Sequence, residues 1–129
     1  MKLLLLLLLA VQTNARPGWL GMGFTHHTKD AEQWLIVRIV PPGGPADVAG
    51  VKVNDVVTAI DGKAIQAKDS VALLESMASI KPGQKVKLTI VREQKSEKRV
   101  LTAAPMTDEQ FERWKRNLEL AREKRDRER

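Results

Sequence analysis

The chain has 129 residues, no cysteine and a formal net charge of +6. Its length suits one domain with short appendages, and the lack of cysteine excludes disulfides, a thiol nucleophile and thiolate zinc sites. The positive charge does not predict nucleic-acid binding, because the sequence has neither a nucleic-acid motif nor basic stretches interleaved with exposed aromatic residues.

Residues 1–15 have the composition of a secretory signal. Lys2 precedes an apolar run that begins at Leu3, and the segment ends at Ala15, a small residue of the kind that signal peptidase requires. The run is much shorter than the roughly 20 residues of a membrane-spanning helix. We expect a cleaved signal, a mature chain that starts near Arg16 without a membrane span, and a periplasmic or secreted location. A retained N-terminal anchor is the alternative.

A glycine-interrupted apolar run follows the predicted signal: Trp19-Leu20-Gly21-Met22-Gly23-Phe24. Glycine at 21 and 23 lets the backbone turn its N–H groups inward and admits a ligand closely. The apolar residues between them would anchor the loop and line a pocket. Residues 25–28 then predict a strand that lines a groove.

Two strands and a short helical turn come next. Residues 34–40 are aromatic and β-branched, which predicts a strand. Pro45 and Gly50 suit the first position and the C-terminal end of a helical turn. Residues 53–60 predict another strand, which ends in the tight turn Asp61-Gly62.

The second half predicts one helix and a hairpin. Asp69 or Ser70 can cap a helix that runs to about Ile80. Residues 85–90 alternate between polar and apolar, as in a half-buried strand, and a polar turn over 93–97 leads to a last strand over 99–103. Basic residues gather along this hairpin, as on a solvated strand face: Lys85, Lys87, Arg92, Lys95, Lys98 and Arg99. Weak attraction to anionic polymers or lipid is the alternative.

The order loop, strand, helical turn, strand and tight turn resembles a PDZ domain over residues 18–104. The stretch from Gly43-Gly44-Pro45-Ala46-Asp47 to Ile60-Asp61-Gly62 carries most of the resemblance. Asn54 replaces the usual glycine before Asp55, and asparagine tolerates left-handed geometry. The resemblance implies an α+β, mainly β fold, a partly open barrel of five to six strands with two helices. We expect this domain over residues 16–105 and an added amphipathic helix over 106–129.

The position of the glycine loop also predicts the strand order. Only residues 16–18 separate the predicted cleavage site from the loop, so there is no room for the leading strand of animal-type PDZ domains. The partner strand must then come from the C-terminal side, over residues 99–103. This permuted arrangement resembles the PDZ domains of bacterial envelope proteases.

The resemblance implies a module that captures extended C-terminal peptides of other proteins by β-strand addition, with loop N–H groups on the terminal carboxylate. Two registers are open, 19–22 as in bacterial relatives and 21–24 as in animal-type domains; we favour the first. An arginine contact to the carboxylate would come from Arg16 or Arg38. The expected peptide-binding residues are Trp19, Leu20, Gly21, Met22, Gly23, Phe24, Thr25 and His26, with Val71, Leu74 and Met77 as the helix wall.

The tail predicts a helix that starts with the capping-box spacing of Thr107 and Gln110. Phe111, Trp114 and Leu118 then recur at intervals of three and four and form one apolar stripe. Three interpretations stay open. The stripe docks on its own domain, binds a partner helix or a second copy, or covers the groove.

No catalytic centre is predicted. The serines at 70, 76, 79 and 96 lack a nucleophile context, and adjacent His26 and His27 on a strand face opposite sides, so they cannot easily share a metal. We expect no enzyme activity, cofactor or metal. The alternatives to peptide binding are an assembly role through the C-terminal helix, or service as the substrate-binding arm of a separate envelope protease.

Overall fold

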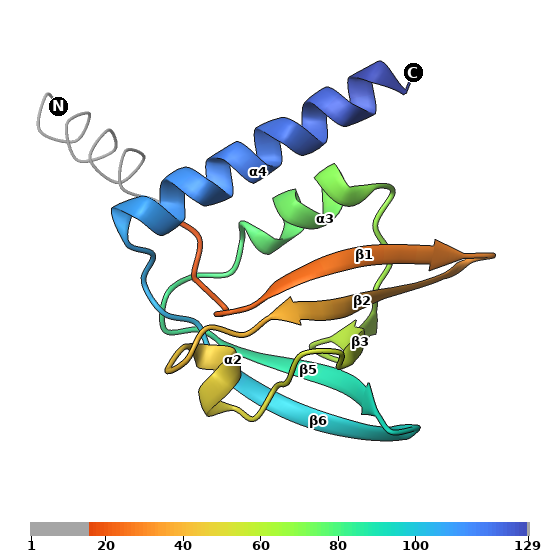
Figure 1. The fold of residues 1–129 in the computed structure, drawn as a ribbon, viewed down its shortest axis with the longest axis vertical. Coiled ribbons are helices and arrows are strands. Elements are labelled where there is room, and N and C mark those ends of the chain that lie inside the picture. Colours follow the sequence, from red (N-terminus) through yellow and green to blue (C-terminus); the bar gives the residue numbers. More distant parts are fainter. Residues whose placement is uncertain (1–15, 129) are drawn as a thin grey trace, which may run out of the picture.

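The computed structural model describes residues 16–128 (Figure 1). The predicted signal over residues 1–15 lies outside the described residues. Within residues 16–128, no helix combines the length and the apolar character that crossing a membrane requires.

One antiparallel sheet of six strands forms the body of the domain. Its main path runs through β1 (Gly23–Lys29), β2 (Glu32–Ile39), β3 (Val56–Ile60), β5 (Lys85–Arg92) and β6 (Lys95–Thr102), and the short β4 (Lys63–Ala64) pairs with β3. The helices are α2 (Pro45–Val48), α3 (Ser70–Met77) and α4 (Asp108–Arg127). This arrangement confirms the predicted α+β fold with an added C-terminal helix.

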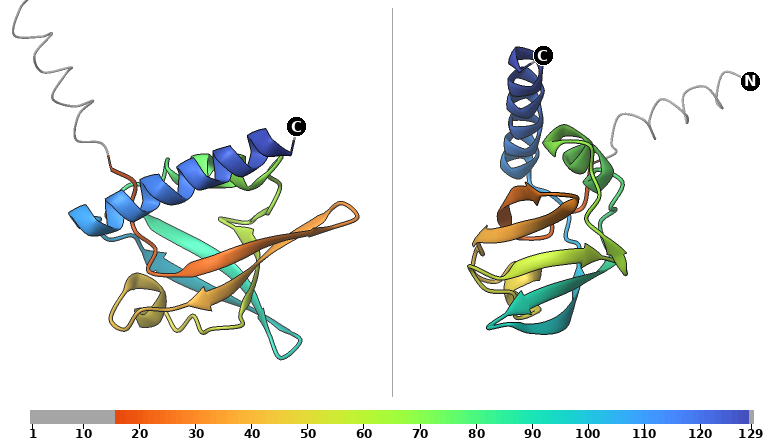
Figure 2. Two further views of the ribbon diagram at one scale, coloured as in Figure 1. Left: turned by 45° about the horizontal axis from the view of Figure 1, so that its top comes forward. Right: turned by 90° about the vertical axis from the view of Figure 1, so that its right-hand side faces the viewer.

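The helices lie at two different places on this sheet. Figure 2 shows from two sides that α4 runs along α3, on the same side of the domain as β1, whereas α2 lies toward β6. The core is built from alternate strand residues that are fully buried: Leu35, Val37, Val57, Val86, Leu88, Ile90 and Leu101. This alternation is the expected pattern for a sheet with one face inside. Leu73 of α3 and Ile80 after it close the core.

Several predicted boundaries differ from the structure. The strand predicted over 53–60 begins only at Val56. The helix α3 ends at Met77 rather than near Ile80, because the N–H groups of residues 79 and 80 bond three residues back in a tighter turn. The polar turn occupies only Glu93 and Gln94, both with positive φ (52° and 66°), so β6 begins at Lys95. This is the geometry of a two-residue hairpin turn. The strand predicted from residue 34 begins at Glu32.

The chain before the glycine loop pairs with the C-terminal side of the domain. The Trp19 N–H donates to the Ala104 carbonyl at 2.7 Å, and the Ala104 N–H donates back at 2.9 Å. The C-terminal origin of the partner agrees with the prediction. The pairing residue, however, is Ala104, because residues 99–102 belong to β6 and pair with β5.

A buried ion pair joins the turn before β3 to the end of β5. Asp55 is only 2% exposed; its carboxylate accepts from Arg92 Nε at 2.8 Å, Arg92 Nη2 at 2.7 Å and the Lys52 N–H at 2.8 Å. Burial opposes ionisation of Asp55. The Arg92 and Lys52 hydrogen bonds and the nearby arginine charges outweigh it, so the pKa of this carboxyl lies below its ordinary value.

The helix α4 docks on the domain along its predicted apolar stripe. Leu118 is only 8% exposed, although it lies on a helix rich in charge. Arg122 Nη2 reaches Glu75 Oε1 of α3 at 3.2 Å, and Arg16 Nη2 reaches Asp108 Oδ1 at 2.8 Å. Both pairs are largely exposed, so each contributes little by itself. The burial of Leu118 is therefore the main anchor.

The substitution Asp55→Asn is expected to lower the free energy of unfolding at neutral pH by about 3 kcal/mol, because it leaves the Arg92 charge without its partner. The pKa of Asp55 is lower in the folded state than in the unfolded state, where it is near 3.8, so ionised Asp55 stabilises the fold above that pH. This stabilisation is lost as the pH falls through the folded-state pKa. Urea unfolding from about pH 5 to about pH 2 should show a steeper loss of stability for the wild type. Equal slopes for both proteins would contradict the ion pair.

The substitution Leu118→Ala is expected to cost about 2 kcal/mol of unfolding free energy, through lost burial and the remaining cavity. The matched control is Leu120→Ala on the same helix, because Leu120 is 55% exposed and should change stability by less than about 0.5 kcal/mol. Urea unfolding followed by circular dichroism measures both. Indistinguishable curves for the two variants would show that α4 does not dock in this way.

Candidate functional site

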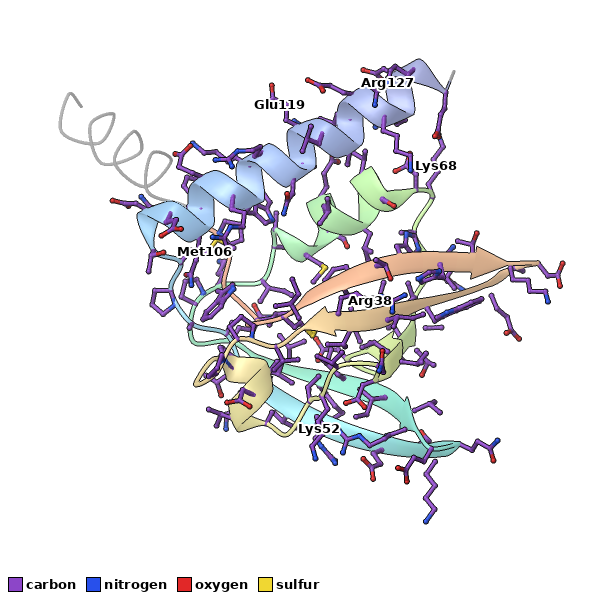
Figure 3. The ribbon with its side chains drawn as sticks, in the orientation of Figure 1. Arg38, Lys52, Lys68, Met106, Glu119 and Arg127 are labelled. Carbon is purple, nitrogen blue, oxygen red and sulfur yellow. The ribbon has the colours of Figure 1, made fainter. Side chains whose placement is uncertain are left out.

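A cavity of about 330 Å³ opens between β1 and α3, at the end where the glycine loop enters the sheet. Met106, which lies at the entry to α4, marks this end of the molecule in Figure 3. The lining is almost wholly apolar: Pro17, Gly18, Trp19, Leu20, Met22, Gly23, Phe24, Leu74, Met77, Ile80, Met106, Trp114 and Asn117. The glycine loop, the wall of α3 and the start of α4 therefore meet at one cavity.

The loop is fixed by a close approach at Gly21. Its φ is +74°, and a Cβ at this position would lie 2.7 Å from Pro45 Cδ and 2.9 Å from the Pro45 nitrogen. Any other residue would therefore push against the start of α2. The Ala46 N–H donates to the Leu20 carbonyl at 3.0 Å, which ties the same loop to α2.

The backbone N–H groups of the loop divide into two sets. Those of Gly18 and Trp19 are used, donating to the carbonyls of Ile80 at 2.6 Å and Ala104 at 2.7 Å. Those of residues 20–22 have no hydrogen-bond acceptor within residues 16–128. Successive free N–H groups in a turn form a cradle for an anion. The loop therefore has the unbonded donors that such a cradle requires.

The strand β1 offers an open backbone edge beside this loop. It lies at the end of the strand order and, in the described part of the chain, pairs only with β2. Gly23 and Phe24 at its start line the same cavity as Leu74 and Met77 of α3. An added strand that follows β1 would thus run from the loop along α3.

The far end of the groove is bridged by side chains. His26 Nδ1 lies 3.4 Å from Ser70 Oγ at the start of α3, and His26 Nε2 lies 2.9 Å from Gln33 Oε1. The hydroxyl oxygen of the exposed Thr25 lies 2.7 Å from His27 Nε2, within hydrogen-bond distance. Neither Thr25 nor His26 lines the cavity, so the structure places these two predicted residues further along the groove.

Three more predicted contact residues lie away from the cavity. Val71 is only 2% exposed and does not line it. Arg38 Nε donates to Thr25 Oγ1 at 3.3 Å. The guanidinium of Arg16 is held by Asp108 and lies 4.7 Å from the centre of the Phe111 ring. Leu74 and Met77 remain as the predicted wall of α3.

The structure adds six cavity residues to the predicted peptide-binding set: Pro17, Gly18, Ile80, Met106, Trp114 and Asn117. The first three flank segments that were predicted to form the site. The last three lie on α4 or just before it, and only Trp114 among them belongs to the apolar stripe that the sequence showed. Of the interpretations left open for the stripe, which include a partner helix, the position of Trp114 at the groove of its own domain agrees with docking on the domain or covering of the groove.

The contacts of Ser70 and His26 do not form a catalytic pair. Their separation is long for a hydrogen bond, and His26 is oriented by the Gln33 amide rather than by a carboxylate. In the part of the chain that the structure describes, no three histidine or acidic side chains gather into a metal site.

A second cavity of about 440 Å³ lies behind the β1–β2 hairpin, between Trp34, Thr58 and Gln66. Neither the glycine loop nor the wall of α3 contributes to it. The smaller cavity, where the glycine loop meets the wall of α3, is therefore the better candidate site.

Comparison with curated proteins gives serine endoproteases among the relatives. A probable periplasmic serine endoprotease DegP-like from Brucella suis is 36% identical over 100 residues, which cover 71% of this chain and 19% of the relative. The serine endoprotease DegS from Escherichia coli strain K12 is 36% identical over 67 residues, covering 51% of this chain and 18% of the relative. The chain thus spans about a fifth of the length of the relatives it matches.

Solved structures show the same fold. The HtrA-type protease AlgW with decapeptide aligns with a TM-score of 0.60 at 21% identity, over 83% of this chain and 36% of that one. The serine endoprotease from Yersinia pestis aligns with a TM-score of 0.59 at 20% identity, over 79% and 34%. A family model described as PDZ domain matches residues 18–102. Because this match covers more than half of the chain, the protein belongs to the PDZ domain family.

Proposed function

We propose that this protein captures the C-terminal end of an extended peptide by adding it as a strand to β1. The observation that carries the proposal is the run of free N–H groups at residues 20–22: Leu20 and Met22 line the apolar cavity, and Gly21 between them packs against Pro45. These donors would bind the terminal carboxylate. The open edge of β1 would pair with the peptide backbone, and the cavity would hold the last side chain.

The division between hydrogen-bonded and free N–H groups supports the loop register 19–22, which is that of bacterial relatives. The donors of Gly18 and Trp19 are already occupied within the domain, so the cradle starts at Leu20. In this register Leu20, Gly21 and Met22 donate to the carboxylate. The cradle ends where β1 begins at Gly23, so a bound carboxylate would lie at the head of the open edge.

The lining of the cavity favours an apolar last residue. Leu20, Met22, Leu74 and Met77 offer no charge to a ligand side chain, and a buried charge without a partner would be costly. We expect weak affinity, on the order of micromolar, or about −8 kcal/mol. Such affinity suits a module that samples many peptide ends.

The relatives support a place and a context for this function. Those compared here are named as serine endoproteases, and the one from Brucella suis as periplasmic. The solved AlgW structure contains a decapeptide. We infer that the protein is periplasmic or secreted and that its groove binds the C-terminal ends of peptides. The second candidate function is that of a substrate-binding arm for a separate envelope protease. The assembly role through α4 is less favoured, because Leu118 is already buried within the chain.

The primary test titrates the purified protein, without a tag at its N-terminus, into fluorescent peptides that have either a free or an amidated C-terminus. Free termini should bind saturably in fluorescence polarisation, and amidation should weaken binding by at least about 100-fold, because hydrogen bonds to a charged group are lost. Equal affinity for the free and amidated forms would exclude the carboxylate mechanism. Absence of binding to any peptide would exclude the proposed function.

The substitution Leu74→Glu should abolish binding of the free-carboxylate peptides, because it places a negative charge in the apolar cavity beside the carboxylate. Leu120→Glu is the matched control, since it makes the same change at an exposed position on α4. Circular dichroism should show that both variants fold. If Leu74→Glu binds as the control does, the peptide does not enter this cavity.

A further inference from the structure

We propose that Trp114 of α4 determines which last side chain the groove accepts. This inference rests on the proposed function, because it concerns the cavity that would hold the end of the peptide. The matched family region ends at residue 102, so α4 lies beyond the part of the chain that defines the domain. It is nevertheless part of the cavity wall.

The cavity has two kinds of wall. Leu20 and Ile80 belong to the buried core of the domain, and both are less than 8% exposed. Trp114 and Asn117 lie on α4, one helical turn apart, and line the same cavity from outside this core. The first wall cannot yield without disturbing the core. The second wall is therefore a part that can set the size of the cavity, together with the partly buried Met22, Phe24 and Met77.

The Trp114 ring is held in place by its neighbours. It stacks on Phe111, with ring centres 6.1 Å apart and planes inclined by 9°. Phe111 is in turn contacted by two cations, Arg16 at 4.7 Å and Lys115 at 4.8 Å from its centre. Such contacts orient aromatic rings as well as stabilise them. Trp114 is thus a positioned wall rather than a freely rotating side chain.

The position of α4 itself is fixed along its length. Its start is held by the Thr107–Gln110 capping box and by the pair of Arg16 with Asp108. Leu118 anchors its middle, and Arg122 bonds Glu75 of α3. Figure 3 shows Glu119 on the side of α4 that faces away from the sheet. The helix therefore presents its Trp114 side to the cavity.

Trp114 borders the cavity that would hold the last side chain of the peptide. At about 330 Å³ the cavity lies near the lower limit of ligand pockets, about 300–1,000 Å³. A smaller side chain at position 114 would enlarge this space, which would favour large last side chains over small ones. Asn117 adds a side-chain amide to an otherwise apolar lining, where it can bond the peptide backbone.

The test compares a panel of free-carboxylate peptides that differ only in the last residue: alanine, valine, leucine, phenylalanine or tryptophan. In Trp114→Ala, the affinity ratio of the phenylalanine end to the valine end should rise by at least about tenfold, because the added space accommodates the larger ring. Trp114→Leu should shift the ratio in the same direction but less. Leu120→Ala, on the same helix but exposed, should leave the ratio unchanged.

The possible outcomes separate this inference from the proposed function. An unchanged ratio in both Trp114 variants, with binding retained, would overturn the inference alone. A uniform gain for all peptides would also overturn it, since it would make α4 a cover over the groove rather than a selective wall. If no peptide binds the wild type or either Trp114 variant, the proposed function itself fails. Trp114→Leu keeps a large apolar side chain, so it tests the inference even if Trp114→Ala loosens α4.

Discussion

The paired hydrogen bonds between Trp19 and Ala104 are the constraint on which the rest of the structure depends. They close the domain by joining the segment before the glycine loop to the segment after β6. A Cβ at Gly18 would lie 2.7 Å from the Ala103 Cβ and 2.9 Å from the Lys81 backbone, so this junction needs glycine. Because these bonds use the N–H groups before the loop, the free donors begin at Leu20.

The same junction determines where the C-terminal helix starts. The chain leaves Ala104 beside the glycine loop, and the capping box at Thr107 begins α4 a few residues later. There is too little chain between these points for the helix to start far from the groove, because each residue spans at most about 3.6 Å. A single backbone pairing thus brings together the donors, the cavity and the helix that walls it.

The sequence predicted the elements well because their signals are local. Pro45 at a helix start, Asn54 with left-handed φ and Asp69 as a helix cap each depend on near neighbours in the chain. The missed features depend on tertiary packing. Helical spacing placed Val71 in the same row as Leu74 but could not tell which row faces the groove. It also showed the stripe through Trp114 without showing the surface on which it lies.

The division of the site between backbone and side chains explains how specificity could arise in so small a domain. In the proposed binding mode, strand addition and the N–H cradle would contact atoms that every free peptide end possesses, so they would supply affinity but little discrimination. Discrimination would then come from the cavity, and one of its walls is carried by a helix anchored mainly through Leu118. A ligand that contacts Trp114 would stabilise the docked position of the helix. The docked helix would in turn strengthen the binding of that ligand by the same free energy. Anything that loosens α4 would in consequence alter which peptide ends are held, even if the loop and β1 stay unchanged.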